Sequence, residues 1–247
     1  IRMSSLHPAE LTDELLAVWA GSPYMMPHVH LSLQSGSDGV LDRMGRGYTA
    51  DEYAAAVERA RAALGGRSPQ ANGYNDCSSR PAGTPPQEGI DKSPLHGRGG
   101  RNEVTDGVGP AITTDVIVGF PGETDEEFEE TFEFCRRIGF AGMHIFKFSP
   151  RPGTRAADMP NPVDPQVAQA RHARLAALAD EMALAFNQSF VGQTVSVLVE
   201  RCKDGVCSGG SEHYVPMRFS GKDELIGTVV SVKVQQASAK ELTGERA

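Results

Sequence analysis

Two patterns of apolar residues alternate along the chain up to about residue 150. Short continuous apolar runs are typical of buried strands, and apolar residues spaced three or four apart are typical of helices that pack on one face. The segment 112–134 contains both, because an apolar run ends at a Gly-Phe-Pro-Gly turn (119–122) and a helix-periodic acidic stretch follows. Thr124 and Glu127 match the capping box of a helix start. Ligands of parallel α/β sheets bind where strands end and helices begin, so this turn is the first candidate for a functional site.

The alternation of strands and helices predicts a parallel α/β fold. Val29, Leu31 and Leu33 alternate with polar residues, which is a strand pattern. Thr49 and Glu52 form a second capping box, and a glycine follows each of the two capped helices. Strands are expected over 28–34, 111–118 and 142–148, and helices over 8–20, 49–64, 124–138 and 164–190, with a short helix before Gly45.

Residues 65–110 differ in kind from the rest of the chain. These 46 residues hold ten Gly, six Pro and only four of Ile, Leu, Val and Phe. Such a composition buries too little apolar surface to offset the entropy lost on ordering. We therefore expect a disordered insertion between a helix and the following strand, where a short connection is usual.

The composition changes again after Gly192. Three segments rich in β-forming side chains follow, and they are separated by turns that contain glycine. This pattern predicts a small all-β barrel, and the final residues are expected to form a frayed tail. The expected units are 1–64 with 111–190 (α/β), 65–110 (insertion), 192–236 (β-barrel) and 237–247 (tail).

The composition of the chain argues against several classes of protein. The chain is 39% hydrophobic and 23% charged, with a net charge of −8, which is ordinary for a globular protein and argues against a broadly basic nucleic-acid surface. No apolar run approaches the roughly 18 residues of a membrane span. The four cysteines include no CxxC pair, so we expect neither a disulfide framework nor a metal site, and a reducing, cytoplasmic setting.

Four long segments resemble the methylthiotransferases of the radical S-adenosylmethionine (SAM) superfamily, in that family's order. They are RMSSLHP (2–8), PHVHLSLQSGSDGVLDRMGRGYTADEY (27–53), TTDVIVGFPGETDEEFEETFEF (113–134) and HIFKFSPRPGTRAADMP (144–160). Within the family, the SSL-x-P segment and FSPRPGT most resemble the enzymes that act on threonylcarbamoyladenosine in tRNA. EHYVPMRF (212–219) and ELIGTVVSVKV (224–234) resemble the TRAM module, a small RNA-binding β-barrel.

The resemblance implies an α/β fold made of a partial (β/α) radical SAM barrel, followed by a small all-β TRAM/OB-like barrel. In this family SAM and a [4Fe-4S] cluster lie at the carboxyl ends of the strands, and reductive cleavage of SAM gives a 5′-deoxyadenosyl radical. The radical abstracts hydrogen from C2 of the adenine at tRNA position 37, where a sulfur is placed and methylated. The implied activity is methylthiolation of N6-threonylcarbamoyladenosine, with an electron donor protein as a partner and a monomeric enzyme.

Two features depart from the family. The CxxxCxxC motif that ligates the radical cluster, and the amino-terminal domain with the cysteines of a second cluster, have no counterpart in this sequence. Iron–sulfur clusters are held by cysteine thiolates, so we expect a carboxyl-terminal fragment that is inactive alone. The insertion at 65–110 is also foreign to the family.

The resemblance assigns roles to individual residues. Asp115 matches an acid that accepts both ribose hydroxyls of SAM, and the alternative is a solvated or capping carboxylate. Gln34 matches a ribose or carboxylate contact, or is a strand-end amide. Arg46 matches an arginine that pairs with the SAM carboxylate, which a planar guanidinium suits. The other candidates for cofactor binding are Ser35, Ile117, Gly119 and Phe148.

Three neighbouring residues have two readings each. Glu123 either orients the glycine turn or favours the helix start through its charge. His30 either faces the cavity or is a hydrogen-bonded barrel histidine, which is the commoner outcome. Phe146 is expected in the core rather than as a platform for a nucleoside.

Basic residues are the candidates for RNA binding. Residues 192–247 carry seven basic and seven acidic side chains, so their net charge is zero and the RNA hypothesis rests on the resemblance. Tyr214 and Phe219 either stack on bases or fill the small barrel. The candidate phosphate contacts are Arg151, Lys203, Arg218, Lys222 and Lys233.

Two other functions remain open from the sequence. The sister branch of the family methylthiolates an aspartate of a ribosomal protein. A non-catalytic RNA-binding fragment that lacks the cluster is an alternative of a different class. Binding of tRNA without SAM would favour that fragment.

Overall fold

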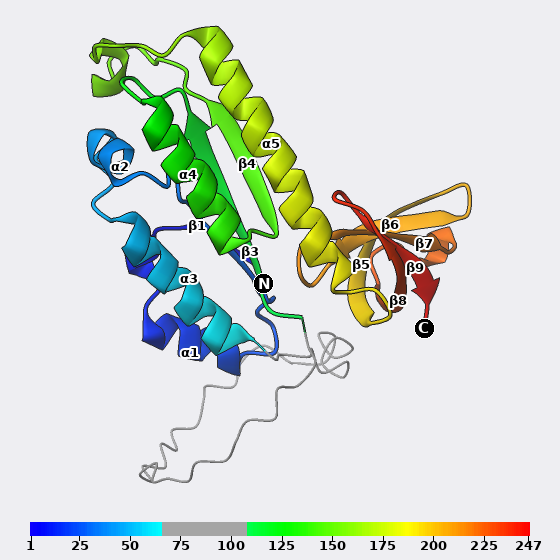
Figure 1. Ribbon diagram of the computed structural model, residues 1–247. Coiled ribbons are helices and arrows are strands. Elements are labelled where there is room, and N and C mark those ends of the chain that lie inside the picture. The colour runs from blue at the N-terminus through cyan, green and yellow to red at the C-terminus, as the bar shows by residue number, and fades with distance from the viewer. Residues whose placement is uncertain (66–107) are drawn as a thin grey trace, which may run out of the picture.

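The computed structural model describes residues 1–65 and 108–247 (Figure 1). In these ranges the chain forms a parallel sheet of four strands, in the order β1-β2-β3-β4, and a closed β-barrel of five strands. The expected insertion at 65–110 lies almost entirely outside the described residues. The elements of the sheet unit are β1 (Met3–Leu6), α1 (Asp13–Gly21), β2 (His28–Leu31), α2 (Asp38–Met44), α3 (Ala50–Leu64), β3 (Ala111–Val118), α4 (Asp125–Ile138), β4 (Gly142–Lys147) and α5 (Pro165–Gln188), with 3-10 turns η1 (Pro8–Glu10) and η2 (Arg155–Asp158).

Both predicted capping boxes are confirmed. Thr124 Oγ1 accepts a hydrogen bond from the Glu127 N–H at 3.2 Å, and Glu127 Oε2 accepts one from the Thr124 N–H at 3.0 Å. Thr49 and Glu52 make the same pair of contacts at the start of α3. These caps satisfy amide groups that the first helical turn leaves without partners, which explains why both helices begin at the predicted positions.

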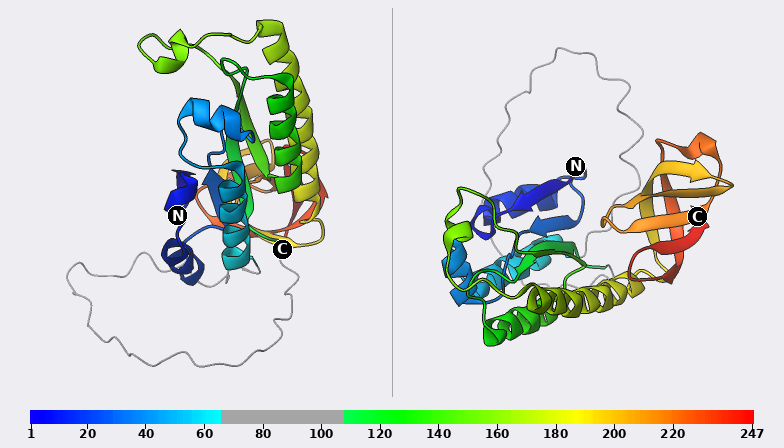
Figure 2. Two further views of the ribbon diagram at one scale, coloured as in Figure 1. Left: turned by 60° about the vertical axis from the view of Figure 1, so that its left-hand side comes forward. Right: turned by 90° about the horizontal axis from the view of Figure 1, so that it is seen from above.

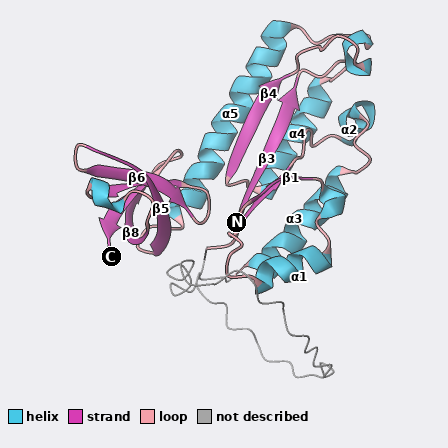
Figure 3. Ribbon diagram, turned by 180° about the vertical axis from the view of Figure 1, so that it is seen from behind, coloured by secondary structure: helices cyan, strands magenta, loops and turns pink. Residues whose placement is uncertain are grey.

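Helices cover one face of the sheet. Helices α1, α3, α4 and α5 follow one another around that face (Figures 1 and 2), where Val116 and Val118 of β3 join the main apolar core. Figure 3 shows the molecule from behind, with the strands in front of the helices. The alternation of side chains along β3 therefore divides it into a helix-facing side and an open side, on which Asp115 and Ile117 lie. The sheet does not close, so the expected partial barrel stays a prediction.

Two predicted elements are interrupted in the structure. The helix expected over 8–20 begins only at Asp13, because Thr12 caps α1 by accepting a hydrogen bond from the Leu15 N–H at 3.2 Å. The strand expected over 28–34 ends at Leu31. Gln34 rejoins the sheet as a single bridge to Val116, with a left-handed φ of 69° that breaks the extended backbone.

The second unit is the closed barrel, in the strand order β5-β6-β7-β9-β8. The expectation of a frayed tail over 237–247 is wrong, because β9 fills the position between β7 and β8 and buries Leu242. A Cβ at Gly244 would lie 2.0 Å from the Lys233 carbonyl oxygen, so close pairing requires glycine here. The strands are β5 (Thr194–Lys203), β6 (Val206–Ser211), β7 (Pro216–Ser220), β8 (Val229–Ala237) and β9 (Leu242–Arg246), with a 3-10 turn η3 (Asp223–Leu225).

The sequence predicted no disulfide framework, and the structure contains one disulfide that this prediction missed. Cys202 and Cys207 face each other across the β5–β6 hairpin and are joined by a disulfide, with their Cα atoms 4.0 Å apart. The spacing of five residues hid this pair, because only the hairpin register brings the two side chains together. Cys135 is a free cysteine in the described part of the chain, and burial raises the pKa of its thiol to about 12.

Helix α5 connects the two units. Leu175, Leu178 and Met182 of this helix join the main core under the sheet, while Phe186, near its carboxyl end, packs against the core of the barrel. Figure 1 shows this helix running from the sheet to the barrel without a break. No helix in the described ranges is long and apolar enough to cross a membrane.

The barrel also contacts the sheet at the amino-terminal ends of β1 and β2. The Tyr214 ring lies 4.7 Å from the His28 ring, and the Arg2 guanidinium lies 4.9 Å from the centre of the Tyr214 ring. Glu212 and His213 are buried at the same junction. Burial raises the pKa of Glu212 to about 7 and lowers the pKa of His213 to about 4, so a charged Glu212 has no cationic histidine beside it at neutral pH.

We expect Glu212→Gln to stabilise the protein at high pH. The folded state favours protonated Glu212, so its ionisation destabilises folding progressively from about pH 4.5 to about pH 7 and fully above that. The variant removes this penalty, a gain of roughly 1–3 kcal/mol at pH 8 that vanishes near pH 4.5. Denaturant unfolding across pH measures the difference.

His28 and His213 titrate in both proteins, so their contributions cancel in this comparison. Glu200→Gln is the matched control, because Glu200 is exposed on β5 of the same barrel. A difference between Glu212→Gln and the parent that stays constant from pH 4.5 to 8 would contradict the burial argument.

Candidate functional site

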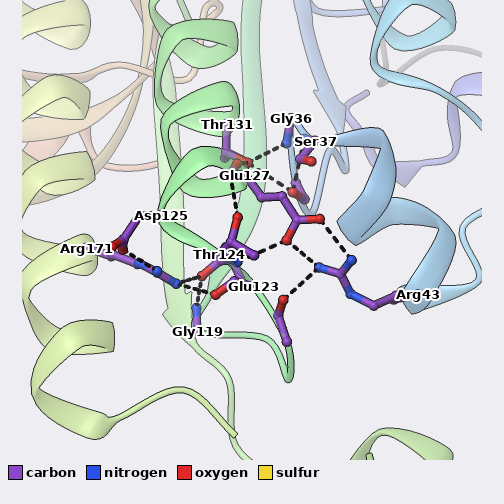
Figure 4. Close-up of polar contacts among 12 residues, drawn as sticks. Gly36, Ser37, Arg43, Gly119, Glu123, Thr124, Asp125, Glu127, Thr131 and Arg171 are labelled. Carbon is purple, nitrogen blue, oxygen red and sulfur yellow. Dashed lines mark hydrogen bonds and ion pairs between the residues drawn. The ribbon is translucent and has the colours of Figure 1, made fainter. Parts of the chain in front are cut away.

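The turn between β3 and α4 is held by a buried ion pair. Arg171 of α5 donates to Glu123 Oε2 at 2.7 Å and to the Glu123 carbonyl at 3.1 Å (Figure 4). The same carboxylate oxygen accepts the Gly119 N–H at 2.7 Å. Burial raises the pKa of Glu123, and the Gly119 amide and Arg171 oppose that rise by binding the ionised form. Glu123 therefore orients the turn, which is the first of its two predicted roles.

A second arginine holds the other side of the turn. Arg43 of α2 donates to both carboxylate oxygens of Glu127, at 2.9 and 2.6 Å, and to the Gly122 carbonyl at 3.3 Å (Figure 4). The hydrogen bond from Arg43 lowers the pKa of Glu127, so this bidentate pair is ionised at neutral pH. The glycine turn is thus fixed from α5 on one side and from α2 on the other.

An open cavity lies at the carboxyl ends of β3 and β4, on the face away from the helices. Its volume is about 590 Å³. Predicted cofactor ligands from separate segments meet there, since the Gln34 N–H donates to the Asp115 carbonyl at 2.8 Å and the Ile117 N–H donates to the Gln34 carbonyl at 2.9 Å. The lining residues are Gln34, Asp115, Ile117, Phe146, Lys147, Phe148, Ser149, Arg151, Thr154 and Ala156.

Phe146 differs from its prediction. Its side chain is 51% exposed and lines this cavity, whereas a core position was expected. The strand alternation explains the error: Met143 and Ile145 take the helix-facing positions of β4, so Phe146 must point to the open face. An exposed aromatic ring beside a carboxylate gives the cavity both an apolar and a polar wall.

Three predicted ligands lie away from this cavity. Ser35 is fully buried, and its hydroxyl lies 3.0 Å from the Thr131 hydroxyl beneath the turn. Gly119 lines a neighbouring cavity of about 370 Å³, which Phe148 also lines, and a Cβ at Gly119 would lie 2.8 Å from the Ala168 Cβ. Arg46 follows α2, and its buried Nε has no hydrogen-bond partner among the described residues.

The basic residues proposed for RNA binding are exposed, and two of them lie beside acidic residues. Lys203 and Lys222 lie near the same hairpin end, where the Gly221 N–H donates to the Gly205 carbonyl. Arg218 pairs with Glu241 at 3.4 Å, and Lys233 lies opposite Glu245 on β9. Phe219 fills the barrel core, and Tyr214 is 55% exposed at the junction with the sheet.

Sequence reasoning missed Arg171, although a signal was present. Ala168, Leu175, Leu178 and Met182 recur at helical spacing on the buried face of α5, and Arg171 falls on the same face. A charged residue inside an apolar stripe indicates a buried partner, because an unpaired buried charge is costly. The partner, Glu123, was not evident because it lies 48 positions away.

The residues present fit SAM but not the cluster. The cavity offers a carboxylate for hydroxyl groups, an amide and aromatic faces, which suits a nucleoside. No group of three potential metal ligands occurs among the described residues, and the free thiol there, Cys135, is buried in the core. Iron–sulfur clusters require thiolate ligands, so this part of the chain does not supply them.

The fold and the cavity define the class of protein. It is a parallel α/β protein with a ligand-sized cavity at the carboxyl ends of its strands, joined to a small β-barrel. No family model matches the chain.

Curated proteins resemble the chain along almost its whole length. The chain is 38% identical, over 96% of its length, to the tRNA-2-methylthio-N(6)-dimethylallyladenosine synthase of Acidothermus cellulolyticus. It is 36% identical, over 99% of its length, to the synthases of the same name from Maricaulis maris and Streptomyces avermitilis. The alignments cover 40%, 44% and 41% of these relatives, so the chain spans about two fifths of their length.

These relatives are named as synthases of a methylthio-modified adenosine in tRNA, which agrees with the methylthiotransferase resemblance of the motifs. They do not support the predicted threonylcarbamoyladenosine branch, because these relatives are named for dimethylallyladenosine.

Arg171→Met should strongly destabilise the protein. The substitution leaves Glu123 buried without its cation, which costs about 3–5 kcal/mol. Arg174→Met, one turn along the same helix, is the matched control, because Arg174 pairs with Glu129 at the surface and its loss should cost at most about 1 kcal/mol. Chemical unfolding of the two variants measures both values, and similar losses would refute the role of the buried pair.

Proposed function

We propose that this chain is part of a tRNA methylthiotransferase that forms 2-methylthio-N6-dimethylallyladenosine. The observation that carries the proposal is 36–38% identity to synthases of that name along 96–99% of the chain. The structure supports it by providing a cavity that suits the nucleoside part of SAM. The reaction places a methylthio group on C2 of the adenine.

In this proposal the cavity binds SAM. Asp115 accepts hydrogen bonds from the ribose hydroxyls, because a carboxylate oxygen only accepts and a hydroxyl donates. Gln34 contacts the ribose or the carboxylate, and Ile117 and Phe148 supply apolar contacts to the adenine side. SAM bound here would supply the methyl group and, on reduction, the radical for the reaction; the residues of this chain would hold and orient it.

The three predicted SAM ligands that do not line the cavity are Ser35, Gly119 and Arg46. Ser35 and Gly119 are proposed to support the turn beside the site rather than to contact SAM, because the structure buries one and packs the other against α5. Arg46, which has a buried Nε without a partner in the described residues, does not line the cavity, so its pairing with the carboxylate of SAM rests on the motif alone. The cysteines that hold the cluster are proposed to come from a part of the enzyme that this chain does not include.

Asp115→Asn should weaken SAM binding by about tenfold or more in the intact protein, because the amide presents one acceptor fewer and a donor in its place. Isothermal titration with SAM measures the affinity. Asp180→Asn, at an exposed position on α5, is the control and should leave it unchanged. Equal affinities for the parent and Asp115→Asn would remove this residue from the site.

The product identifies the branch. Nucleosides from tRNA treated with the intact enzyme, separated by mass, should contain 2-methylthio-N6-dimethylallyladenosine. A methylthiolated threonylcarbamoyladenosine would restore the branch that the motifs suggest, and a methylthiolated ribosomal peptide would point to the sister family. Binding of tRNA without SAM binding would instead support a non-catalytic fragment.

We also propose that the barrel contacts the tRNA backbone. Replacing Lys203, Arg218, Lys222 and Lys233 with Gln should lower tRNA affinity and reduce its dependence on salt, because fewer counterions are released. Arg136→Gln with Arg137→Gln, on α4, is the control away from the barrel. Filter binding at several salt concentrations measures both, and an unchanged salt dependence would argue against the barrel as the RNA surface.

A further inference from the structure

A chain of polar side chains runs along the open face of the sheet to the cavity. His28 Nε2 lies 2.9 Å from Thr113 Oγ1, and the same oxygen lies 3.0 Å from His30 Nδ1. His30 Nε2 lies 3.2 Å from Asp115 Oδ2. The register of β2 with β3 creates this alignment, because it places His30 directly beside Thr113. Four side chains on two strands therefore form one continuous series of hydrogen bonds.

The direction of these hydrogen bonds follows from their chemistry. A carboxylate oxygen only accepts, so His30 donates its Nε2–H to Asp115. In a neutral His30 the Nδ1 must then accept, and the Thr113 hydroxyl donates to it. Thr113 Oγ1 remains free to accept, and His28 donates its Nε2–H to that oxygen. Every hydrogen in the series thus points toward Asp115.

The buried end of the series supports this direction. His28 Nδ1 is buried without a partner among the described residues, and burial lowers the pKa of His28 to about 4. A neutral His28 carries one ring N–H, and that hydrogen is satisfied only at Nε2, beside Thr113. The reverse direction would leave a buried N–H unpaired, which is rare and costly in proteins. Tyr214 of the barrel packs against the His28 ring.

We propose that His30 and Thr113 are positioning residues that fix the carboxylate of Asp115 for its ligand. Hydrogen bonding to Oδ2 prevents rotation of the carboxylate and keeps one oxygen, Oδ1, available to hydroxyl groups in the cavity. The inference rests on the proposed function, in which Asp115 binds the ribose of SAM. It adds that the ligand meets a preoriented acceptor, which lowers the entropy lost on binding.

The first test needs no ligand. Long-range 1H–15N NMR of the histidine rings in the 247-residue chain should show both His28 and His30 as the Nε2–H tautomer at neutral pH. Thr113→Val keeps the side-chain shape but removes the hydroxyl, so His28 should lose this tautomer preference, whereas His30 keeps its hydrogen bond to Asp115. Thr113→Ser should retain it. A parent protein with His30 in the Nδ1–H form would overturn the proposal at once.

The second test measures the consequence for binding. Thr113→Val should weaken SAM affinity of the intact protein by about tenfold, as loss of an outer-shell partner commonly does, and Thr113→Ser should restore most of it. Thr194→Val, at an exposed site in the barrel, is the matched control. If Thr113→Val does not fold by circular dichroism, Thr113→Ala takes its place in both measurements.

The two proposals fail in distinguishable ways. If Asp115→Asn weakens SAM binding but Thr113→Val does not, the positioning role is wrong and the proposed site stands. If neither variant changes SAM affinity, the proposed site itself is wrong and the positioning role falls with it. Loss of affinity in both variants, with rescue by Thr113→Ser, supports both.

Discussion

The buried ion pair between Glu123 and Arg171 is the constraint on which the rest of the site depends. One carboxylate oxygen binds both the Arg171 guanidinium and the Gly119 amide, so it ties α5 to the turn that follows β3. Desolvation makes either charge alone expensive, which couples the presence of the helix to the shape of the turn. The cavity lies at the carboxyl end of β3, where this turn begins, and neither Glu123 nor Arg171 lines it.

The same helix joins two hydrophobic cores. Because α5 contributes Leu175 and Leu178 to the sheet and Phe186 to the barrel, the barrel is attached by a rigid element rather than by a flexible linker. The contact of Tyr214 with His28 adds a second point of attachment. A proposed RNA-binding barrel held in this way would present a bound tRNA to the sheet in a restricted set of orientations.

The open face of the sheet carries a series of hydrogen-bonded polar side chains and an exposed aromatic ring. His30 contacts Asp115 and is itself held by Thr113, and the half-exposed ring of Phe146 lines the same cavity as Asp115. Polar groups on a sheet face normally compete for water, but here they bond to one another and leave a single carboxylate facing the cavity. The series needs two residues from β2 and two from β3, and it forms only when the two strands pair in the observed register.

Local sequence determined the features that depend on neighbouring residues: both capping boxes, the alternation along β3, and the positions of most helices. The motifs also named Gln34, Asp115, Ile117 and Phe148 as cofactor candidates, and one cavity contains these four together with Arg151, which was a candidate for phosphate. Only the tertiary structure decided what depends on distant partners. The Arg171–Glu123 pair, the Cys202–Cys207 disulfide and the strand at Leu242–Arg246 each require a register or packing contact, which spacing along the chain does not encode.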